Sequence, residues 1–167
     1  MNNLIMIVDK IKSDWSTPRR ATHFGYDCPF LLSSHFSTGI KNHSHTTAVT
    51  SELIKMWEIF ESADLFKDDK YGQWGIKILS PEESIKETSS QKAIRGTNIT
   101  DKDTIFGLFY GDSDFLLIDS HGEIYVGLPL DDRKYWPKVA NSIEDFLVQL
   151  NCSQGAKYWE SQNQTPR

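Results

Sequence analysis

The sequence predicts an α+β protein of a single domain, because helical and strand patterns both occur along a chain of ordinary domain length. The chain has 167 residues, of which 38% are hydrophobic and 25% charged, and this composition is typical of a globular protein. Three segments place apolar residues at helical spacing, and four short apolar runs are typical of strands. The helical segments are 51–63, 80–94 and 141–150, and the apolar runs are 76–79, 104–110, 115–118 and 124–128. We therefore expect residues 1–167 to form one domain.

The first fifty residues carry weaker signals than the rest. Leu4, Ile7 and Ile11 fall on one face of a short helix that we expect over residues 3–12. Residues 16–50 contain two prolines and two glycines among many Ser, Thr, His and Asn residues, and this favours a long loop with short strands.

Capping residues mark the boundaries of the central elements. The helix that begins at Ser51 is expected to end near Ala63. Ser80 as the N-cap, Pro81 at the first helical position and Glu83 three residues after the cap form a capping box for the next helix.

A hairpin and a final helix are expected towards the C-terminus. The last two apolar runs flank Asp119-Ser-His-Gly122, in which glycine supplies the positive φ of a tight turn. Asn141 or Ser142 is the expected N-cap of the amphipathic helix that follows.

The charge balance limits the classes of partner. The formal net charge is −5, without the clustered Lys and Arg that neutralise phosphates, so we do not expect nucleic acid as a partner. The chain also lacks a polybasic stretch for an anionic membrane surface and any run of roughly 20 apolar residues that would cross a bilayer. A basic protein partner is favoured electrostatically.

Cysteine usage and the start of the chain indicate a soluble, cytoplasmic protein. Cys28 and Cys152 lie far apart and have no metal-ligand spacing, and two lone thiols are typical of a reduced compartment. The apolar run Leu4–Val8 is shorter than the core of a signal peptide, and Asp9 follows it directly.

Four histidines in the first fifty residues are candidate metal ligands. No carboxylate or cysteine stands at a recognised ligand spacing to them, and a metal site needs three or four convergent ligands. We therefore interpret them as solvated loop residues and expect neither a metal nor a cofactor. They are His23, His35, His43 and His45.

Asp112-x-Asp114, with Asp119, could serve a metal- or nucleotide-dependent enzyme, because carboxylates at i and i+2 face the same side of a strand. A turn between apolar strands is also where solubilising aspartates belong. The sequence has no Gly-x-Ser-x-Gly motif, no phosphate-binding glycine loop and no Cys–His pairing recognisable as a motif. We expect no enzymatic activity, and a small metal- or nucleotide-dependent enzyme using Asp112, Asp114 and a histidine ranks last among the alternatives.

Five large aromatic residues could form a ligand-stacking surface. Such residues among Leu, Ile and Phe are more often packed in a core, and we expect core positions for them. They are Trp57, Tyr71, Trp74, Tyr135 and Trp136.

Negative charge is concentrated in one block of the sequence. Residues 101–145 contain ten acidic and four basic residues, a net charge of −6, whereas the rest of the chain has 13 acidic and 14 basic residues. The block either keeps the surface solvated or attracts a basic protein. Its six candidate partner-binding residues are Asp112, Asp114, Asp119, Glu123, Asp131 and Asp132.

Short motifs follow one another in a recognisable order between residues 51 and 160. They are Trp57; Leu65-Phe66-x-Asp68-x-x-Tyr71-Gly72-Gln73-Trp74-Gly75-x-x-x-Leu79-Ser80-Pro81; Gly111-Asp112-x-Asp114 and Leu116; Leu128-Pro129-Leu130-Asp131-x-Arg133-x-x-Trp136; Ser142-x-x-x-Phe146-Leu147; and Gly155-x-Lys157-Tyr158-Trp159-Glu160. This ordered set resembles the SUKH superfamily, in particular bacterial relatives of the yeast regulator of cell-wall assembly and glucan synthesis. Residues 1–50 do not match the N-terminal pattern of that family.

The resemblance implies an α+β fold with a central, mostly antiparallel sheet and helices packed against it. It also implies binding without catalysis, because many bacterial members are immunity proteins that neutralise a polymorphic or contact-dependent toxin, often a nuclease, by tight stoichiometric binding. We therefore expect an immunity protein that occludes the active site or substrate groove of a cognate, basic toxin domain. A regulatory protein-interaction module is the alternative, and the oligomeric state is left open.

Overall fold

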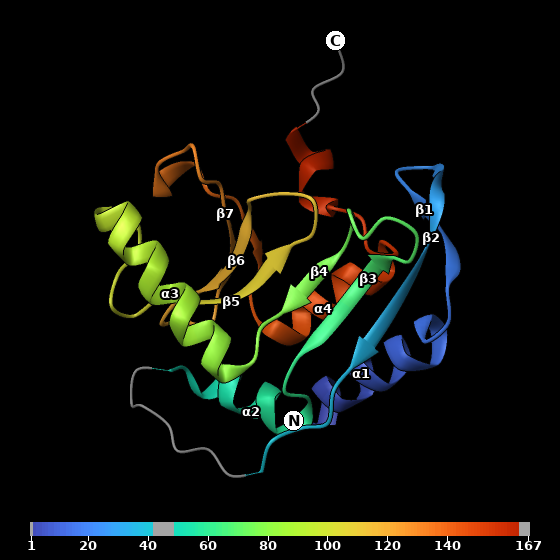
Figure 1. Cartoon of the computed structure of the whole chain (residues 1–167), viewed down its shortest axis with the longest axis horizontal. Coiled ribbons are helices and arrows are strands. Elements are labelled where there is room, and N and C mark those ends of the chain that lie inside the picture. Colours follow the sequence, from blue (N-terminus) through green and yellow to red (C-terminus); the bar gives the residue numbers. More distant parts are fainter. Residues whose placement is uncertain (1, 42–48, 164–167) are drawn as a thin grey trace.

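A computed structural model describes residues 2–41 and 49–163 of the chain (Figure 1). The described residues form four α-helices, eight β-strands and three short 3₁₀ helices. The α-helices are α1 (Asn2–Trp15), α2 (Ser51–Ile59), α3 (Pro81–Arg95) and α4 (Ile143–Cys152); the strands are β1 (Arg19–His23), β2 (Tyr26–Phe36), β3 (Ala63–Asp68), β4 (Ile76–Ile78), β5 (Thr104–Phe109), β6 (Phe115–Ile118), β7 (Ile124–Gly127) and β8 (Lys138–Ala140); the 3₁₀ helices are η1 (Gly96–Asn98), η2 (Arg133–Tyr135) and η3 (Tyr158–Asn163).

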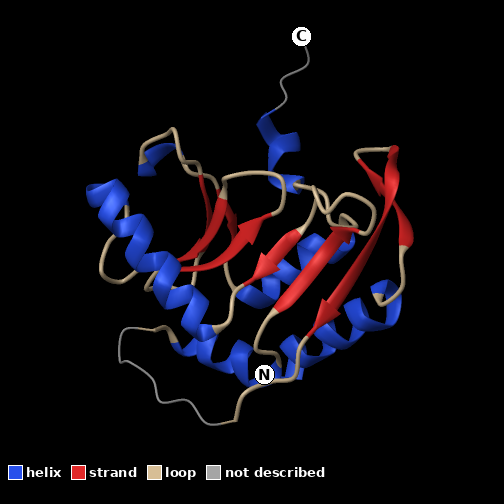
Figure 2. Ribbon diagram, in the orientation of Figure 1, coloured by secondary structure: helices blue, strands red, loops and turns tan. Residues whose placement is uncertain are grey.

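The eight strands form one antiparallel sheet in which every strand pairs with its neighbours in sequence (Figure 2). Antiparallel neighbours need only a hairpin connection, so α2 and α3 are insertions between strands and not crossovers to distant ones. The α+β class and the packing of helices against a central sheet are confirmed.

Helices cover both faces of the sheet. The helices α1, α2 and α4 lie against one face and bury the larger core, which includes Trp57 and Phe146. The helix α3 crosses the other face against β5, next to a smaller core that includes Trp136. Strand β6 contributes to both cores because successive side chains point to opposite faces: Leu116 enters the larger core and Leu117 the smaller.

The N-terminal part of the chain is more regular than the sequence predicts. The helix α1 continues to Trp15, and a hairpin formed by β1 and β2 occupies much of the segment expected to be loop. Strand β2 is 11 residues long, and a bulge between Ser33 and His35 interrupts its alternation of buried and exposed residues. The expectation of mostly irregular structure is therefore wrong for β2.

The helix α2 ends before the predicted boundary at Ala63. Phe60 has extended backbone angles, φ −149° and ψ 137°, and its N–H donates to the carbonyl of Met56, so the helix closes at Ile59. The side chain of Phe60 is fully buried although it lies outside the helix. Its apolar character therefore extends the helical pattern in the sequence beyond the true end of α2. Two strands were not predicted, because their sequences show no clear apolar run. They are β3 and the three-residue β8.

The predicted cap and turn are confirmed. The Ser80 hydroxyl accepts a hydrogen bond from the Glu83 N–H at 3.3 Å, and the Glu83 carboxylate accepts one from the Ser80 N–H at 3.2 Å. In the β6–β7 turn, Gly122 has a φ of 82° and its N–H donates to the Asp119 carbonyl at 3.1 Å.

Both cysteines are free thiols, Cys28 buried and Cys152 exposed, which confirms the prediction of unpaired cysteines. Within the described part of the chain, no helix combines the length and the apolar character needed to cross a membrane.

Candidate functional site

The structure separates the six candidate acidic residues into three places. Asp112 and Asp114 lie in the β5–β6 turn, whereas Asp119 and Glu123 lie in the β6–β7 turn, at the opposite end of β6. Asp131 and its neighbour Asp132 lie in the loop between β7 and β8. The acidic block of the sequence is therefore not one continuous patch.

Ion pairs also compensate four of the ten acidic residues in this block. Two of the cations, Lys92 and Lys157, come from outside the block, so counting charges along the sequence overstates the negative potential of the surface. The pairs are Lys92–Asp101 at 2.7 Å, Arg133–Asp103 at 2.8 Å, Lys157–Asp112 at 2.9 Å and Lys138–Glu123 at 3.1 Å.

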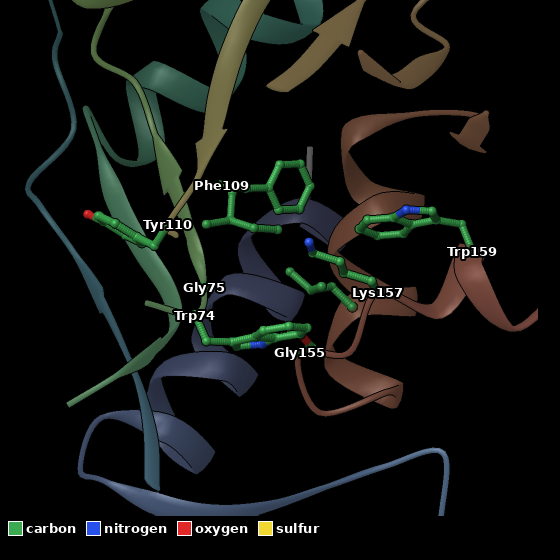
Figure 3. Close-up of a pocket in the computed structure, with 9 residues that line it drawn as sticks. Trp74, Gly75, Phe109, Tyr110, Gly155, Lys157 and Trp159 are labelled. Atoms are coloured by element: carbon green, nitrogen blue, oxygen red, sulfur yellow. The ribbon is translucent and has the colours of Figure 1, made fainter. Parts of the chain in front are cut away.

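At the β5–β6 turn, the Lys157 ammonium lies between the rings of Trp74 and Phe109 (Figure 3). It also forms an ion pair with the carboxylate of Asp112. Its Nζ is 5.2 Å from the ring centre of Trp74 and 5.1 Å from that of Phe109, and it donates to Asp112 Oδ2 at 2.9 Å. A partly desolvated ammonium in such a cage gains both cation–π attraction and a charge-assisted hydrogen bond. The cage holds the C-terminal segment against the end of the sheet.

The two turn aspartates have opposite pKa shifts. Burial alone would raise the pKa of Asp112, but the bonded Lys157 ammonium and the backbone N–H groups of Ser113 and Asp114 outweigh it, and the pKa is lowered. Burial, helped by the adjacent charge of Asp112, raises the pKa of Asp114 to about 6. Asp112 therefore stays ionised while Asp114 takes up a proton as the pH falls through about 6, so the two carboxylates titrate in separate steps.

The space beside the Lys157 cage is too small for a ligand. Its volume is about 10 Å³, which is the room that one water molecule requires. The indole N–H of Trp74 donates to the Gly155 carbonyl at 3.2 Å, and the His23 ring lies 5.5 Å from the Trp74 ring. Trp74 thus acts as a packing residue, although it is only partly buried.

The β6–β7 turn uses its acidic residues to build structure. Asp119 Oδ1 accepts hydrogen bonds from the N–H groups of His121 at 2.9 Å and Glu123 at 3.0 Å. Glu123 accepts a hydrogen bond from the Tyr125 hydroxyl at 3.0 Å and pairs with Lys138. Asp119 and Glu123 therefore have structural roles within the chain, and no partner protein is needed to explain their presence in this turn.

The loop between β7 and β8 has a fixed base. The indole N–H of Trp136 donates to the carbonyls of Leu128, at 3.1 Å, and Asp131, at 2.9 Å. The Arg133 guanidinium donates to both carboxylate oxygens of Asp103, at 2.8 Å and 3.2 Å. The carboxylate of Asp103 is only 3% exposed, so this bidentate pair is largely sheltered from water.

The tip of the same loop projects into solvent. Leu130 is 99% exposed, the highest value among the exposed large hydrophobic residues, and Asp131 and Asp132 beside it are exposed as well. Within the described residues, neither of these two carboxylates takes part in a hydrogen bond or an ion pair. Of the three acidic places, this is the one that combines uncompensated negative charge with an exposed apolar side chain.

The core prediction holds for only part of the aromatic set. Trp57 and Trp136 are buried, at 0% and 4% exposure. Tyr71 and Tyr135 are 64% and 62% exposed, so the prediction of core positions is wrong for both. Each lies in a loop or short 3₁₀ helix, where neighbouring apolar residues in sequence do not share a face.

The candidate metal ligands do not gather in the described part of the chain. His43 and His45 lie outside the described residues. His35 is exposed on β2, and His23 packs on Trp74, where burial lowers its pKa. Across residues 2–41 and 49–163, no group of three or more His, Cys, Asp or Glu side chains is placed to hold a metal ion.

Sequence reasoning missed three features of the site: the Lys157 cage, the Arg133–Asp103 pair and the exposed tip at Leu130. The first two join residues 45 and 30 positions apart, and no local pattern indicates such contacts. The sequence Leu128-Pro129-Leu130 did contain a signal for the third, because an apolar residue between a proline and two aspartates has no strand or helix to bury it.

No protein-family model, curated protein or solved structure matches the chain.

Proposed function

We propose that the protein is an immunity protein: it binds a cognate bacterial toxin domain stoichiometrically and covers the active site or substrate groove of that domain. The observation that carries the proposal is the β7–β8 loop, which presents Leu130 beside Asp131 and Asp132 on a fixed base. The sequence resemblance to the SUKH superfamily supports the same function.

The geometry of the loop favours tight binding. A fully exposed leucine contributes no burial to the fold, whereas an apolar side chain that fills a pocket on a partner supplies a large part of the binding energy. The hydrogen bonds from Trp136 and Arg133 already order the loop, so little conformational entropy is lost when a partner binds.

The charge of the loop favours a basic partner. Asp131 and Asp132 are exposed and uncompensated, and the β5–β6 turn adds Asp114, whose charge depends on pH. A nuclease needs a positively charged groove for the phosphate backbone of its substrate. An acidic loop is complementary to such a groove and would compete with the nucleic acid for it.

The contacts of the Asp112–Asp114 pair favour this function over the enzyme alternative. Asp112 is engaged by Lys157, and the adjacent space accommodates about one water molecule. A carboxylate that anchors the C-terminal segment is a structural group, and this matches a binding protein whose loops must be held in fixed positions.

The test first reads the genes next to that of this protein, where the proposal predicts a gene for a secreted toxin, and then uses the toxin domain of that gene. Wild-type protein should bind the purified domain one-to-one by calorimetry and should protect cells that express it. The variant Leu130→Asp should fold normally and lose protection, whereas Ile85→Asp, at an exposed site on α3, should protect as well as wild type. Wild-type protein that neither binds nor protects would overturn the proposal.

A further inference from the structure

The exposed Leu130 of the β7–β8 loop is one apolar feature of the surface. A second apolar surface lies on the side of the molecule opposite that loop, where α1 and α4 pack side by side (Figure 1). The two helices enclose an open groove of about 340 Å³, whose centre is formed by Met6, Ile7 and Val148. Met6 is 67% exposed and Val148 38% exposed. Two such residues on one groove make an unpartnered apolar strip between helices.

The ends of the groove carry opposite charges. The start of α1 lies beside the start of α4, since Leu4 and Glu144 line one hollow. Lys10 is six residues further along α1, roughly 9 Å at the rise of an α-helix, and lines the same groove. The groove therefore has Glu144 at one end, Lys10 at the other and the apolar strip between them.

This arrangement is complementary to itself. A two-fold axis through the apolar strip, perpendicular to the groove, brings Lys10 of one copy opposite Glu144 of the other, and does so twice. The internal pair of Lys10 with Asp14 is an exposed i,i+4 contact at 3.2 Å, and such a pair is weak enough to rearrange. A partner of uniform charge would match only one end of the groove.

We infer that the α1–α4 groove binds a second copy of this chain and forms a two-fold homodimer. The dimer buries Met6 and Val148 of both copies and joins Lys10 to Glu144 across the interface. Because Figure 1 places α1 and the β7–β8 loop on opposite sides of the molecule, the loop stays free in each copy. The inference is independent of the proposed function.

The decisive experiment is sedimentation equilibrium on two charge variants, alone and mixed. Wild type should show a reversible monomer–dimer equilibrium. Lys10→Glu and Glu144→Lys alone each place like charges together at both contacts, so each should weaken dimerisation at least about tenfold. Their equimolar mixture restores both attractive contacts and should dimerise as well as wild type. The exposed variant Lys86→Glu on α3 is the control and should behave as wild type.

Cross-linking checks the position of the axis. In a Cys152→Ser background, Met6→Cys lies near the axis and should give a disulfide-linked dimer on mild oxidation. Wild-type Cys152 should not, because the axis places the two copies of this thiol at opposite ends of the interface. A wild-type monomer up to millimolar concentration would overturn the inference, as would a variant mixture that associates no better than its components.

Discussion

At the scale of single residues, Asp114 is a group whose charge opposes folding. Its pKa is raised to about 6, so the folded protein holds a proton that the unfolded chain, with a pKa of about 4, releases first. The contribution of the protonated Asp114 to the free energy of unfolding is therefore present in full below pH 4, and it is lost as the pH rises through about 6.

We predict that Asp114→Asn stabilises the protein at pH 7.5 and has no effect at pH 4. The side chain is partly exposed, so solvent screening limits the gain to about 1 kcal/mol and not the full value of the shift. Urea denaturation at the two pH values measures the difference. Asp132→Asn, at an exposed position, serves as the control and should change neither value. An equal gain at both pH values would show that packing, and not charge, is responsible.

Arg133 is the residue that ties the β7–β8 loop to the rest of the molecule. Arg133→Met removes the bidentate contact and leaves the Asp103 carboxylate buried without its cation, which we expect to cost about 3 kcal/mol of unfolding free energy. Lys92→Met removes an ion pair to the fully exposed Asp101 and should have little effect. Guanidinium denaturation of both variants checks this, and equal losses would contradict the assignment.

Which residue-level features could be predicted from the sequence depends on how local they are. Asp119 was predicted as a turn residue, and its carboxylate does accept backbone N–H groups two and four residues ahead. The Lys157 cage could not be predicted, because folding alone brings Trp74, Phe109 and Asp112 next to a lysine from the C-terminal segment. For the same reason, counting charges along the sequence did not reveal that Asp112 is neutralised.

At the scale of elements, helix starts were predicted better than helix ends and short strands. Ser80 and Glu83 form a cap through contacts within four residues, so the sequence shows it. The end of α2 depends on Phe60 leaving the helix to fill the core, and β8 is three residues long with Lys138 exposed. Both features depend on packing between residues distant in the sequence, so the local preference of the residues for helix or strand does not predict them.

Trp136 links the smaller core to the β7–β8 loop. Its ring packs in that core, and its indole N–H donates hydrogen bonds to two carbonyls of the loop. We predict that Trp136→Ala costs about 3–5 kcal/mol of unfolding free energy, as other large-to-small core changes do. Trp136→Phe keeps most of the buried ring and loses the hydrogen bonds to Leu128 and Asp131, so the fold should survive with a looser loop.

The measurement for Trp136→Phe is amide hydrogen exchange. The N–H of Asp131 donates to the Leu128 carbonyl at 3.0 Å and should exchange faster in the variant, whereas the amides of β6 should keep their protection. Uniform loss of protection would mean that Trp136 stabilises the whole sheet and has no separate role in the loop.

At the scale of the whole molecule, two surfaces on opposite sides have different properties. The β7–β8 loop combines an exposed leucine with uncompensated aspartates, and the α1–α4 groove combines apolar side chains with one charge of each sign. The proposed occupant of the first is a basic partner, and that of the second is another copy of the chain. Together they would give a dimer with two outward-facing binding loops.

Association with the toxin domain should be fast at low salt and slow markedly as the ionic strength rises, because charges on exposed loops are screened over about 10 Å at 0.1 M. Reversing both charges in Asp131→Lys with Asp132→Lys should lower the on-rate more than it raises the off-rate, and should weaken protection of toxin-expressing cells. Stopped-flow measurements at several salt concentrations separate these rates.

The control for this prediction is a variant with the same net charge and the changes elsewhere. Asp9→Lys with Glu58→Lys reverses two exposed acids on α1 and α2, far along the chain from the loop. If total charge alone steered association, both double variants would slow it equally. If the loop makes the contact, only the loop variant loses the salt dependence, since the local field at the docking site determines the rate. A folded loop variant that associates and protects as well as wild type would remove Asp131 and Asp132 from the mechanism, and would leave Leu130 to be tested by itself.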